Sequence, residues 1–213
     1  MDGTIYNGGT LFDCTRPFLD LLMRLDIGVT FLTNNSSRSA VDYLGKLQSL
    51  GLSVQLEQIF TSGMAAIEYL RTNHPTYGRL FVLGTKSLRQ EYAEAGFELL
   101  DDVDQGAPDA VVVAFDSELQ YERLCTAAYW ITQGLPFIAT HPDLVCPTDL
   151  DTVLVDCGAI TACLTSATGR SPDVVLGKPH PIMLEGILRR HNLEPPQLAM
   201  VGEAAPVRPD TGD

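Results

Sequence analysis

Short apolar runs rich in β-branched residues alternate with longer segments of helical periodicity along most of this chain. Such alternation is typical of α/β folds, in which helices connect neighbouring parallel strands. The pattern predicts strands at 27–32, 59–61, 80–83, 110–115, 136–139, 174–176 and 198–201. It predicts helices at 15–24, 39–49, 63–73, 86–95, 118–133, 157–168 and 182–191. We therefore expect an α/β protein built around parallel strands.

The composition excludes several classes of function. The formal net charge is −13 and the pI is near 4.5, so binding of nucleic acid or an anionic membrane through bulk electrostatics is not expected. A phosphorylated small molecule remains compatible, because local lysines and backbone N–H groups decide such binding. The five cysteines include no Cys-x-x-Cys pair, which favours a reducing, cytoplasmic setting. The apolar runs are too short to span a bilayer.

Two turn-rich segments interrupt the alternation and divide it into series. The first is His74 to Gly78, and the second is Ser171-Pro172. Proline and glycine in such clusters mark loops rather than helices or strands. The segment between the two boundaries carries a complete α/β series of its own.

A polar run, Thr33 to Ser36, follows one expected strand and precedes an expected helix. Ligands of open α/β sheets bind at the carboxyl ends of strands, and the free N–H groups at a helix start suit a phosphate. The alternative interpretation is an ordinary polar loop that caps the helix. Lys178 stands between Gly177 and Pro179. The proline favours an extended backbone at Lys178, and a fixed ammonium there suits a phosphoryl group. The alternative is a surface lysine in a turn.

Asp2-Gly3-Thr4 would by itself indicate only a turn. Its order relative to the Thr33 run and to Gly177-Lys178-Pro179, however, resembles the haloacid dehalogenase (HAD) superfamily. The segments 82–85, 137–143 and 172–183 resemble its NagD-like, para-nitrophenylphosphatase branch. The resemblance implies a Rossmann-like parallel-sheet core with an inserted α/β cap domain. Residues 1–76 and 172–213 would form the core, and residues 77–171 the cap.

The resemblance also implies an activity and its residues. The family hydrolyses phosphomonoesters of small metabolites through an aspartyl-phosphate, with Mg²⁺ as cofactor. Asp2 would be the general acid/base, and Asp2 and Glu203 would bind the metal. Thr33, Asn34 and Lys178 would hold the phosphate. His141 and Asp143, in a loop after a cap strand, would contact the leaving part of the substrate and set specificity. The cap could also mediate self-association into a homo-oligomer.

Three departures from the family pattern shape the expectations. The family motif reads Asp-x-Asp-Gly-Thr, so its nucleophile would stand directly before Met1, outside these 213 residues. We therefore expect the chain as it stands to have little or no activity. Gly202-Glu203 replaces the family's Gly-Asp, and His141 replaces an Asn, with packing at the domain boundary as the alternative role for His141. The competing hypothesis for the whole chain is a non-catalytic HAD-fold remnant or a phosphometabolite-binding protein.

Overall fold

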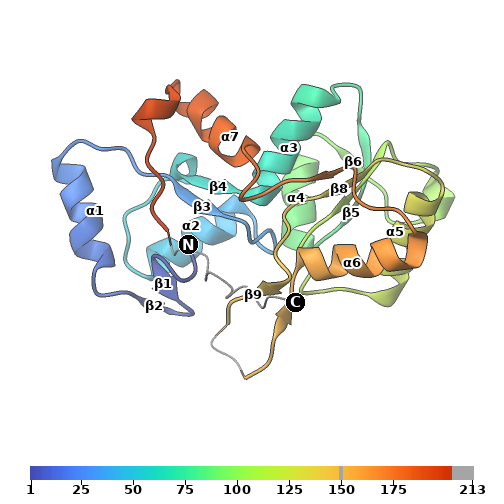
Figure 1. The fold of residues 1–213 in the computed structure, drawn as a ribbon, viewed down its shortest axis with the longest axis horizontal. Helices are drawn as coiled ribbons and strands as arrows, with labels where there is room; N and C mark the ends of the chain where they lie inside the picture. Colours follow the sequence, from blue (N-terminus) through green and yellow to red (C-terminus); the bar gives the residue numbers. More distant parts are fainter. Residues whose placement is uncertain (149–150, 203–213) are drawn as a thin grey trace, which may run out of the picture.

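The computed structural model describes residues 1–148 and 151–202, and its largest element is a parallel sheet of five strands. The strand order is β11-β8-β7-β5-β6, and every pair in it is parallel. The strands are β5 (Arg79–Leu83), β6 (Glu98–Leu99), β7 (Ala110–Val113), β8 (Phe137–Ala139) and β11 (Val174–Val175). This sheet occupies one end of the molecule (Figure 1). The expected α/β class with parallel strands is confirmed.

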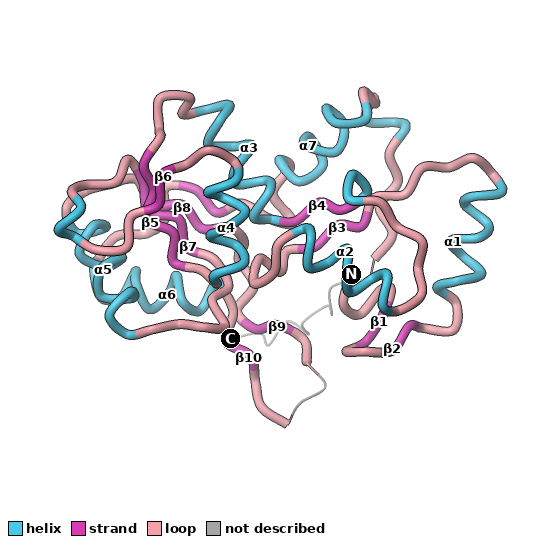
Figure 2. The backbone as a smooth tube through the Cα atoms, turned by 180° about the vertical axis from the view of Figure 1, so that it is seen from behind, coloured by secondary structure: helices cyan, strands magenta, loops and turns pink. Residues whose placement is uncertain are grey.

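A smaller unit contains the N-terminus and a two-stranded parallel sheet. Its strands are β3 (Phe31–Thr33) and β4 (Ile59–Thr61), and Thr33 lies opposite Thr61. The other elements of the unit are the antiparallel pair β1 (Tyr6–Asn7) and β2 (Thr10–Leu11) with helices α1 (Thr15–Arg24) and α2 (Ala40–Ser49). In Figure 2 this unit and the five-stranded sheet again lie at opposite ends of the long axis.

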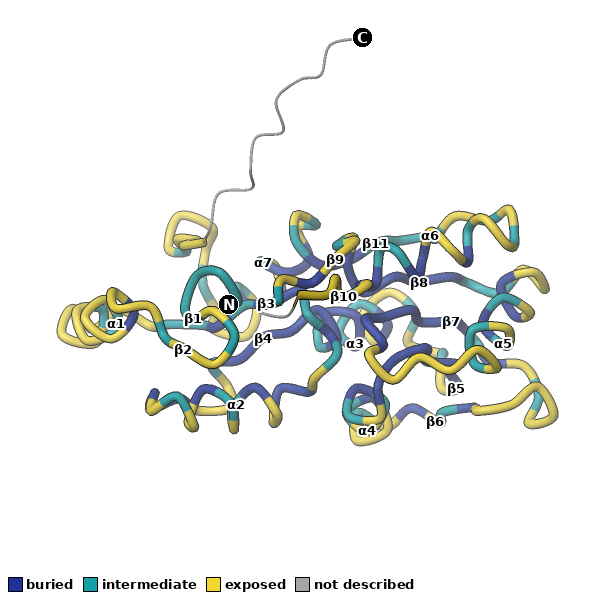
Figure 3. Tube along the Cα trace, turned by 90° about the horizontal axis from the view of Figure 1, so that it is seen from below, coloured by how far each residue is buried: buried dark blue, intermediate teal, exposed yellow. Residues whose placement is uncertain are grey.

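Helices cover both faces of the five-stranded sheet and give it two cores. Alternate residues of β7 serve the two cores: Ala110 and Val112 pack on one side, and Val111 and Val113 on the other. Because both faces are buried, the strand is apolar throughout instead of alternating. The helices of this part are α3 (Ser62–Asn73), α4 (Lys86–Glu94), α5 (Tyr121–Thr132) and α6 (Cys157–Thr168), and helix α7 (Ile182–His191) packs against α3. Figure 3 shows β7 and β8 as buried as this packing requires.

The two sheets share one hydrophobic core. Phe60 of β4 belongs to the same buried cluster as Leu80 of β5 and Met183 of α7. Helix α3 follows β4 directly and packs against α7, so these two helices join the units. Loops that approach the junction from either sheet are therefore held at a fixed separation.

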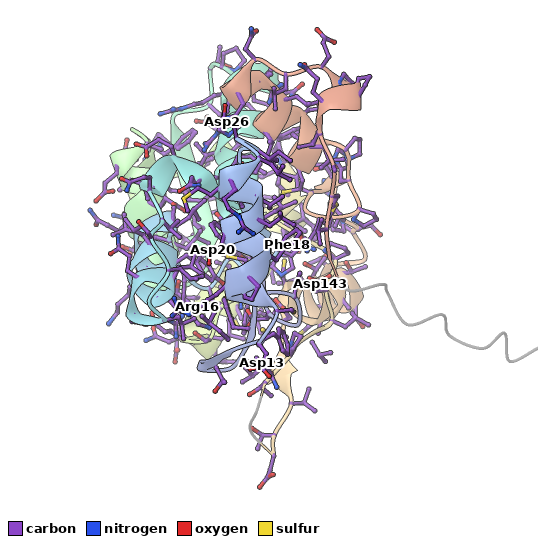
Figure 4. All side chains as sticks on the ribbon, turned by 90° about the vertical axis from the view of Figure 1, so that its left-hand side faces the viewer. Asp13, Arg16, Phe18, Asp20, Asp26 and Asp143 are labelled. Carbon is purple, nitrogen blue, oxygen red and sulfur yellow. The ribbon has the colours of Figure 1, made fainter. Side chains whose placement is uncertain are left out.

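Helix α1 is attached more loosely than the other helices. Met23 is 72% exposed and Leu25 is 58% exposed, and no element covers this helix in Figure 4. Its main polar anchor is Arg16, whose guanidinium donates to the carbonyls of Leu50 and Gly51 at 2.7 Å each. A pocket of about 460 Å³ lies between α1 and the segment that leads into β3. The helix is thus held by hydrogen bonds at one end and by limited apolar contact elsewhere.

Several predicted elements differ from the structure in extent. Helices 15–24, 157–168 and 182–191 have the expected bounds. The expected strand at 27–32 is shortened to β3, because only residues 31–33 face β4 as a partner. The helix expected from 118 begins at Tyr121, since Asp116 accepts a hydrogen bond from the Glu118 N–H and holds the preceding residues in a turn.

The strand expected at 198–201 was a wrong prediction, because these residues form no strand in the structure. Met200 and Val201 are 57% and 66% exposed, and only Leu198 packs against the core. A strand requires a neighbour that pairs with its N–H and C=O groups, and no described strand lies alongside this segment. An apolar segment therefore does not form a strand unless a neighbouring strand is available to pair with it.

The structure adds two details to the predicted organisation. Strand β11 follows the expected domain boundary at 171/172 in the sequence, yet it pairs with β8 in the five-stranded sheet. The domain boundaries themselves stay a prediction. A short antiparallel pair, β9 (Val145–Cys146) and β10 (Leu154–Val155), was not predicted, because two-residue strands carry no periodic signal. None of the described helices is both long and apolar enough to cross a membrane.

Candidate active site

Three loops that follow parallel strands meet at the junction of the two sheets. They are the loop after β3, which contains Asn34, the loop after β8, which contains Asp143, and the loop after β11, which contains Lys178. Figure 1 shows β3 and β8 approaching the centre of the molecule from opposite sides. Asn34 precedes Asp143 and Lys178 by more than a hundred positions in the sequence, so their meeting is a product of the fold.

The Asn34 side chain ties the three loops together. Its Nδ2 donates to Oδ2 of Asp143 and to the carbonyl of Lys178, both at 3.1 Å. Its Oδ1 accepts from the Lys178 N–H at 2.7 Å. The residue is only 6% exposed, so these hydrogen bonds are shielded from water. One neutral amide thus fixes the backbone at Lys178 and the position of a carboxylate.

Thr33 and the residues after Asn34 form an ordered polar turn. The Thr33 hydroxyl accepts from the Asn35 N–H at 3.3 Å, and Oδ1 of Asn35 accepts from the Ser37 N–H at 3.0 Å. Ser39 then caps α2 and shares a reciprocal capping box with Asp42. The residue that caps α2 is therefore Ser39, which follows the polar run of Thr33 to Ser36, while Thr33 remains at the end of β3 beside Asn34.

Asp2 is brought to the same region by contacts around β3. The Met1 amino group donates to the Leu32 carbonyl at 3.3 Å, which places Met1 beside the strand. The Tyr6 hydroxyl donates to Oδ2 of Asp2 at 3.3 Å, and Nζ of Lys46 lies 3.9 Å from Oδ1. Burial raises the pKa of Tyr6, so this hydroxyl remains a donor at neutral pH. Both contacts to Asp2 are long, which leaves its oxygens able to accept further ligands.

The positive charge of Lys178 affects the amino group of Met1, the residue directly before Asp2. The pKa of the Met1 amino group is lowered to about 6, first by burial and next by the charge of Lys178. The Lys46 charge acts in the same direction, and the Asp2 charge opposes it. A cation is thus disfavoured at this point, mainly by burial, and only the contribution of Lys178 and Lys46 would favour a carboxylate nearby.

His141 lies at the same junction but inside the protein. Its side chain has no exposed surface, and Nε2 lies 2.8 Å from Oδ1 of Asp156. Nδ1 lies 3.0 Å from the Thr140 hydroxyl and 3.3 Å from the Ser62 hydroxyl. A substrate has no access to this ring in the observed conformation. Its contacts are those of a boundary residue, and its role in specificity stays a prediction, as does that of Asp143.

Comparison with known proteins places this geometry in a family. A family model described as haloacid dehalogenase-like hydrolase matches residues 1–98. The acid sugar phosphatase of Staphylococcus epidermidis is 31% identical over 203 residues, which are 95% of this chain and 76% of that protein. The chain belongs to the haloacid dehalogenase-like hydrolases. The recognition made from the three sequence motifs is confirmed.

Solved structures locate this hydrolase within the family. The 4-nitrophenylphosphatase of Thermotoga maritima superimposes with a TM-score of 0.84 at 36% identity, covering 91% of this chain and 72% of that one. A glycerol phosphate phosphatase of Mycobacterium tuberculosis, solved in complex with magnesium, gives a TM-score of 0.81 at 30% identity. That match covers 90% of this chain and 56% of the mycobacterial one. The para-nitrophenylphosphatase branch expected from the sequence is confirmed.

Buried residues that the sequence did not single out support the hydrolase's loops. Helix α3 is capped by Thr61, and the hydroxyl of its first residue, Ser62, donates to the Asn34 carbonyl. The Ser36 hydroxyl accepts from the Phe115 N–H at 3.0 Å and lies 3.2 Å from the Thr140 hydroxyl. Single serines in polar loops give no sequence signal for such contacts. These hydrogen bonds join loops that are distant in the sequence, so they follow from the three-dimensional fold.

The described residues contain one group with the spacing of a metal site. Ligand atoms of His141, Asp143 and Asp156 all lie within 4.8 Å of one another. Oδ1 of Asp156, however, already accepts from the Cys157 N–H at 2.6 Å and faces His141 at 2.8 Å. These contacts satisfy the buried pair without an ion. The metal ligands that the resemblance implies, Asp2 and Glu203, are not part of this group. Glu203 lies outside the described residues.

Gly177 allows the loop after β11 to approach His141. It has φ of 73°, and a Cβ added there would lie 2.4 Å from Cβ of His141. Gly177→Ala should therefore lower the free energy of unfolding by about 2–4 kcal/mol, through backbone strain and steric overlap. Urea denaturation measures this loss.

Gly169→Ala is the matched control for that substitution. Gly169 has a similar φ of 69°, but nothing lies within 4 Å of an added Cβ. It should lose only the strain component, about 1 kcal/mol. Equal losses at the two positions would show that close packing at Gly177 is not required.

Proposed function

We propose that this chain provides the substrate site of a Mg²⁺-dependent phosphatase that acts on phosphomonoesters of small metabolites through an aspartyl-phosphate. The observation that carries the proposal is the hydrogen-bonded set in which Asn34 holds Lys178 and Asp143 beside Thr33. The names of the relatives support it, since those proteins act on sugar phosphates, glycerol phosphate and nitrophenyl phosphate. The identity of the metabolite is left open by this set of relatives.

The nucleophile of such a reaction would be a carboxylate directly ahead of Met1. The charges of Lys178 and Lys46, which add to burial in lowering the pKa of the Met1 amino group, would favour a carboxylate near this point, and the Asp2 charge would oppose it. The 213 residues do not themselves include this carboxylate. A polypeptide of these residues alone should therefore have little turnover, since covalent catalysis requires the attacking group.

The remaining residues have separate tasks in this proposal. The Thr33 hydroxyl and the backbone N–H groups of its loop hold oxygens of the phosphoryl group. The ammonium of Lys178 offsets the negative charge that builds up as a carboxylate attacks a phosphate. Asp2 gives a proton to the leaving oxygen and then takes one from the attacking water. The fixed backbone at Lys178 keeps its charge aimed at the reacting atoms.

The residues present fit a magnesium ion. Mg²⁺ prefers oxygen ligands, often one or two carboxylates, with water completing the shell. Asp2 is partly exposed, and its carboxylate makes only contacts of 3.3 and 3.9 Å, so it retains capacity for an ion. Asp2 would hold the ion together with Glu203. When bound, Mg²⁺ supplies positive charge to the phosphoryl oxygens.

The test uses an extended chain, meaning these 213 residues preceded by an apolar strand from one of the relatives that ends in aspartate. Its hydrolysis of para-nitrophenyl phosphate, glycerol 3-phosphate and a sugar phosphate should require Mg²⁺. Removal of the ion with EDTA should lower turnover by at least about 100-fold, and added Mg²⁺ should restore it.

Two outcomes would contradict the proposal. Hydrolysis that is insensitive to EDTA would exclude the role given to magnesium. Binding of these phosphate esters by the extended chain without turnover would instead favour a phosphometabolite-binding protein. The unmodified 213-residue chain serves as the low-activity reference in both comparisons.

A further inference from the structure

The five-stranded sheet has a point at which the chain's direction of winding reverses. Strand β5 is followed by α4 and then by β6 on its outer side, whereas β7 is followed by α5 and then by β8 on the other side. The loops after β5 and β7 therefore diverge. Open α/β sheets bind ligands in the crevice at such a switch point, at the carboxyl ends of the strands. Nothing in the proposed phosphatase reaction uses this crevice.

A pocket of about 550 Å³ occupies that crevice. We refer to it as the switch-point pocket, and its principal lining residues are Gly84, Lys86, Arg89, Asp116, Glu118 and Arg123. It is separate from the candidate active site, because Lys178 follows β11 and β8 lies between β11 and β7. A 550 Å³ volume is in the range of sites for small metabolites.

Two arginines on one wall of the pocket have fewer acceptors than donors. Both guanidiniums contact the same oxygen of Asp101: Nη1 of Arg123 lies at 2.8 Å, and Nη2 of Arg89 also contacts it. Nε of Arg89 is shielded from solvent and has no acceptor among the described residues. Burial, and next the charge of Arg123, lower the pKa of Arg89. An anion in the pocket would relieve the repulsion between the two guanidiniums, which share one carboxylate oxygen.

Arg123 is held in place without the help of a ligand. Its Nη2 donates to the Val82 carbonyl at 2.6 Å, and its guanidinium lies 5.1 Å from the centre of the Phe81 ring. The wall is therefore ordered before an anion arrives, which reduces the entropy cost of binding.

Carboxylates form another part of the pocket. Asp116 is 5% exposed, its Oδ1 accepts from the Glu118 N–H at 2.9 Å, and burial raises its pKa. Oε2 of Glu118 accepts from the Lys86 N–H at 2.9 Å, at the start of α4. Glu118 thus covers the start of α4, and the other oxygens of both acids can accept hydrogen bonds from hydroxyl groups.

We propose that the switch-point pocket binds a small anion that carries hydroxyl groups, with the anionic group on Arg89 and Arg123 and the hydroxyls on Asp116 and Glu118. A polyol phosphate and a hydroxy acid share this chemistry. The pocket is distinct from the site of phosphate transfer, and binding there does not require the nucleophile or the magnesium ion of the proposed function.

Isothermal titration of the 213-residue chain in EDTA tests the proposal with three probes: glycerol 3-phosphate, glycerate and inorganic phosphate. The expected result is a dissociation constant of about 1 mM or lower for at least one hydroxylated anion. All titrations are repeated in a Lys178→Met background, which weakens phosphate binding at the candidate active site. In that background Arg89→Gln should weaken the binding at least 10-fold, while the exposed-surface control Arg24→Gln should leave it unchanged. Stronger binding of glycerol 3-phosphate than of glycerate identifies a polyol phosphate, and the reverse identifies a hydroxy acid.

Amide chemical shifts provide a second measurement that does not depend on a substitution. The bound anion should shift the Gly84 amide, which lines the pocket, and leave the amide of Gly45 on the distant helix α2 unchanged. Three outcomes would overturn the proposal: no binding by any probe, binding that is lost in Lys178→Met but kept in Arg89→Gln, or equal affinity for inorganic phosphate and both hydroxylated anions.

Discussion

Joining an apolar strand that ends in aspartate to Met1 should raise phosphatase turnover by on the order of 10⁴ or more, because loss of a nucleophile elsewhere costs at least that much. The Met1 nitrogen would become the amide that joins the new aspartate to Met1, so the added carboxylate would lie close to it. The pKa of the Met1 amino group, about 6, reflects burial first and then the charge of Lys178. The Lys178 charge would attract a carboxylate in this region. Hydrolysis of para-nitrophenyl phosphate in Mg²⁺ measures the difference.

The same extension ending in asparagine separates chemistry from folding. It supplies the same strand and nearly the same side-chain volume but no nucleophile, so it should remain close to the 213-residue chain in turnover. Equal activity of the aspartate and asparagine forms would show that the extension acts only by completing the fold. Turnover of the 213-residue chain within 10-fold of the aspartate form would exclude the nucleophile assigned here.

Lys178→Met in the extended chain should lower kcat by about 10²–10³, the size of effect seen when one preorganised charge or donor is removed from a transition state. The backbone at Lys178 is fixed on both its N–H and its carbonyl by Asn34, so the substitution removes a charge without freeing the loop. The effect should fall mainly on kcat, since the charge is needed most when the carboxylate attacks. Steady-state kinetics with para-nitrophenyl phosphate measure it.

Arg24→Met is the control for the change in net charge. Arg24 is an exposed residue in the last turn of α1 and makes none of the contacts described for the site. It should keep kcat within about 2-fold of the parent, consistent with the small effects of surface substitutions. A similar fall in both variants would show that net charge, and not the position of Lys178, controls the rate.

The fold was predictable where local pattern and tertiary partner agree. The run at 110–115 is buried on both faces of the sheet, so its continuous apolar sequence identifies a strand correctly. The run at 198–201 is similarly apolar, yet it has no neighbouring strand in the described part of the chain and remains irregular. Pairing partners are a property of the whole fold, and a window of sequence does not contain them.

The residues of the candidate site that belong to sequence motifs could be predicted, whereas the buried residues that hold them in place could not. Thr33, Asn34 and Lys178 were found because each follows a strand in a recognisable order, and the structure brings Asn34 and Lys178 into direct contact. Ser62 and Asp156 carried no signal, because the contacts of Ser62 with Asn34 and of Asp156 with His141 arise from the folded structure and not from a local motif. For His141, packing at the domain boundary was one of two interpretations that the sequence left open, and the structure buries its side chain fully.

The central claim is that the loops carrying Thr33, Asn34 and Lys178 enclose a phosphoryl group facing the residue ahead of Met1. A crystal structure of the extended chain with Mg²⁺ and orthovanadate tests it most directly. The account predicts vanadate oxygens at hydrogen-bond distance, about 2.7–3.2 Å, from the Thr33 hydroxyl and from Nζ of Lys178, with the vanadium facing the added aspartate. Vanadate bound only elsewhere, for example in the switch-point pocket, would contradict the claim.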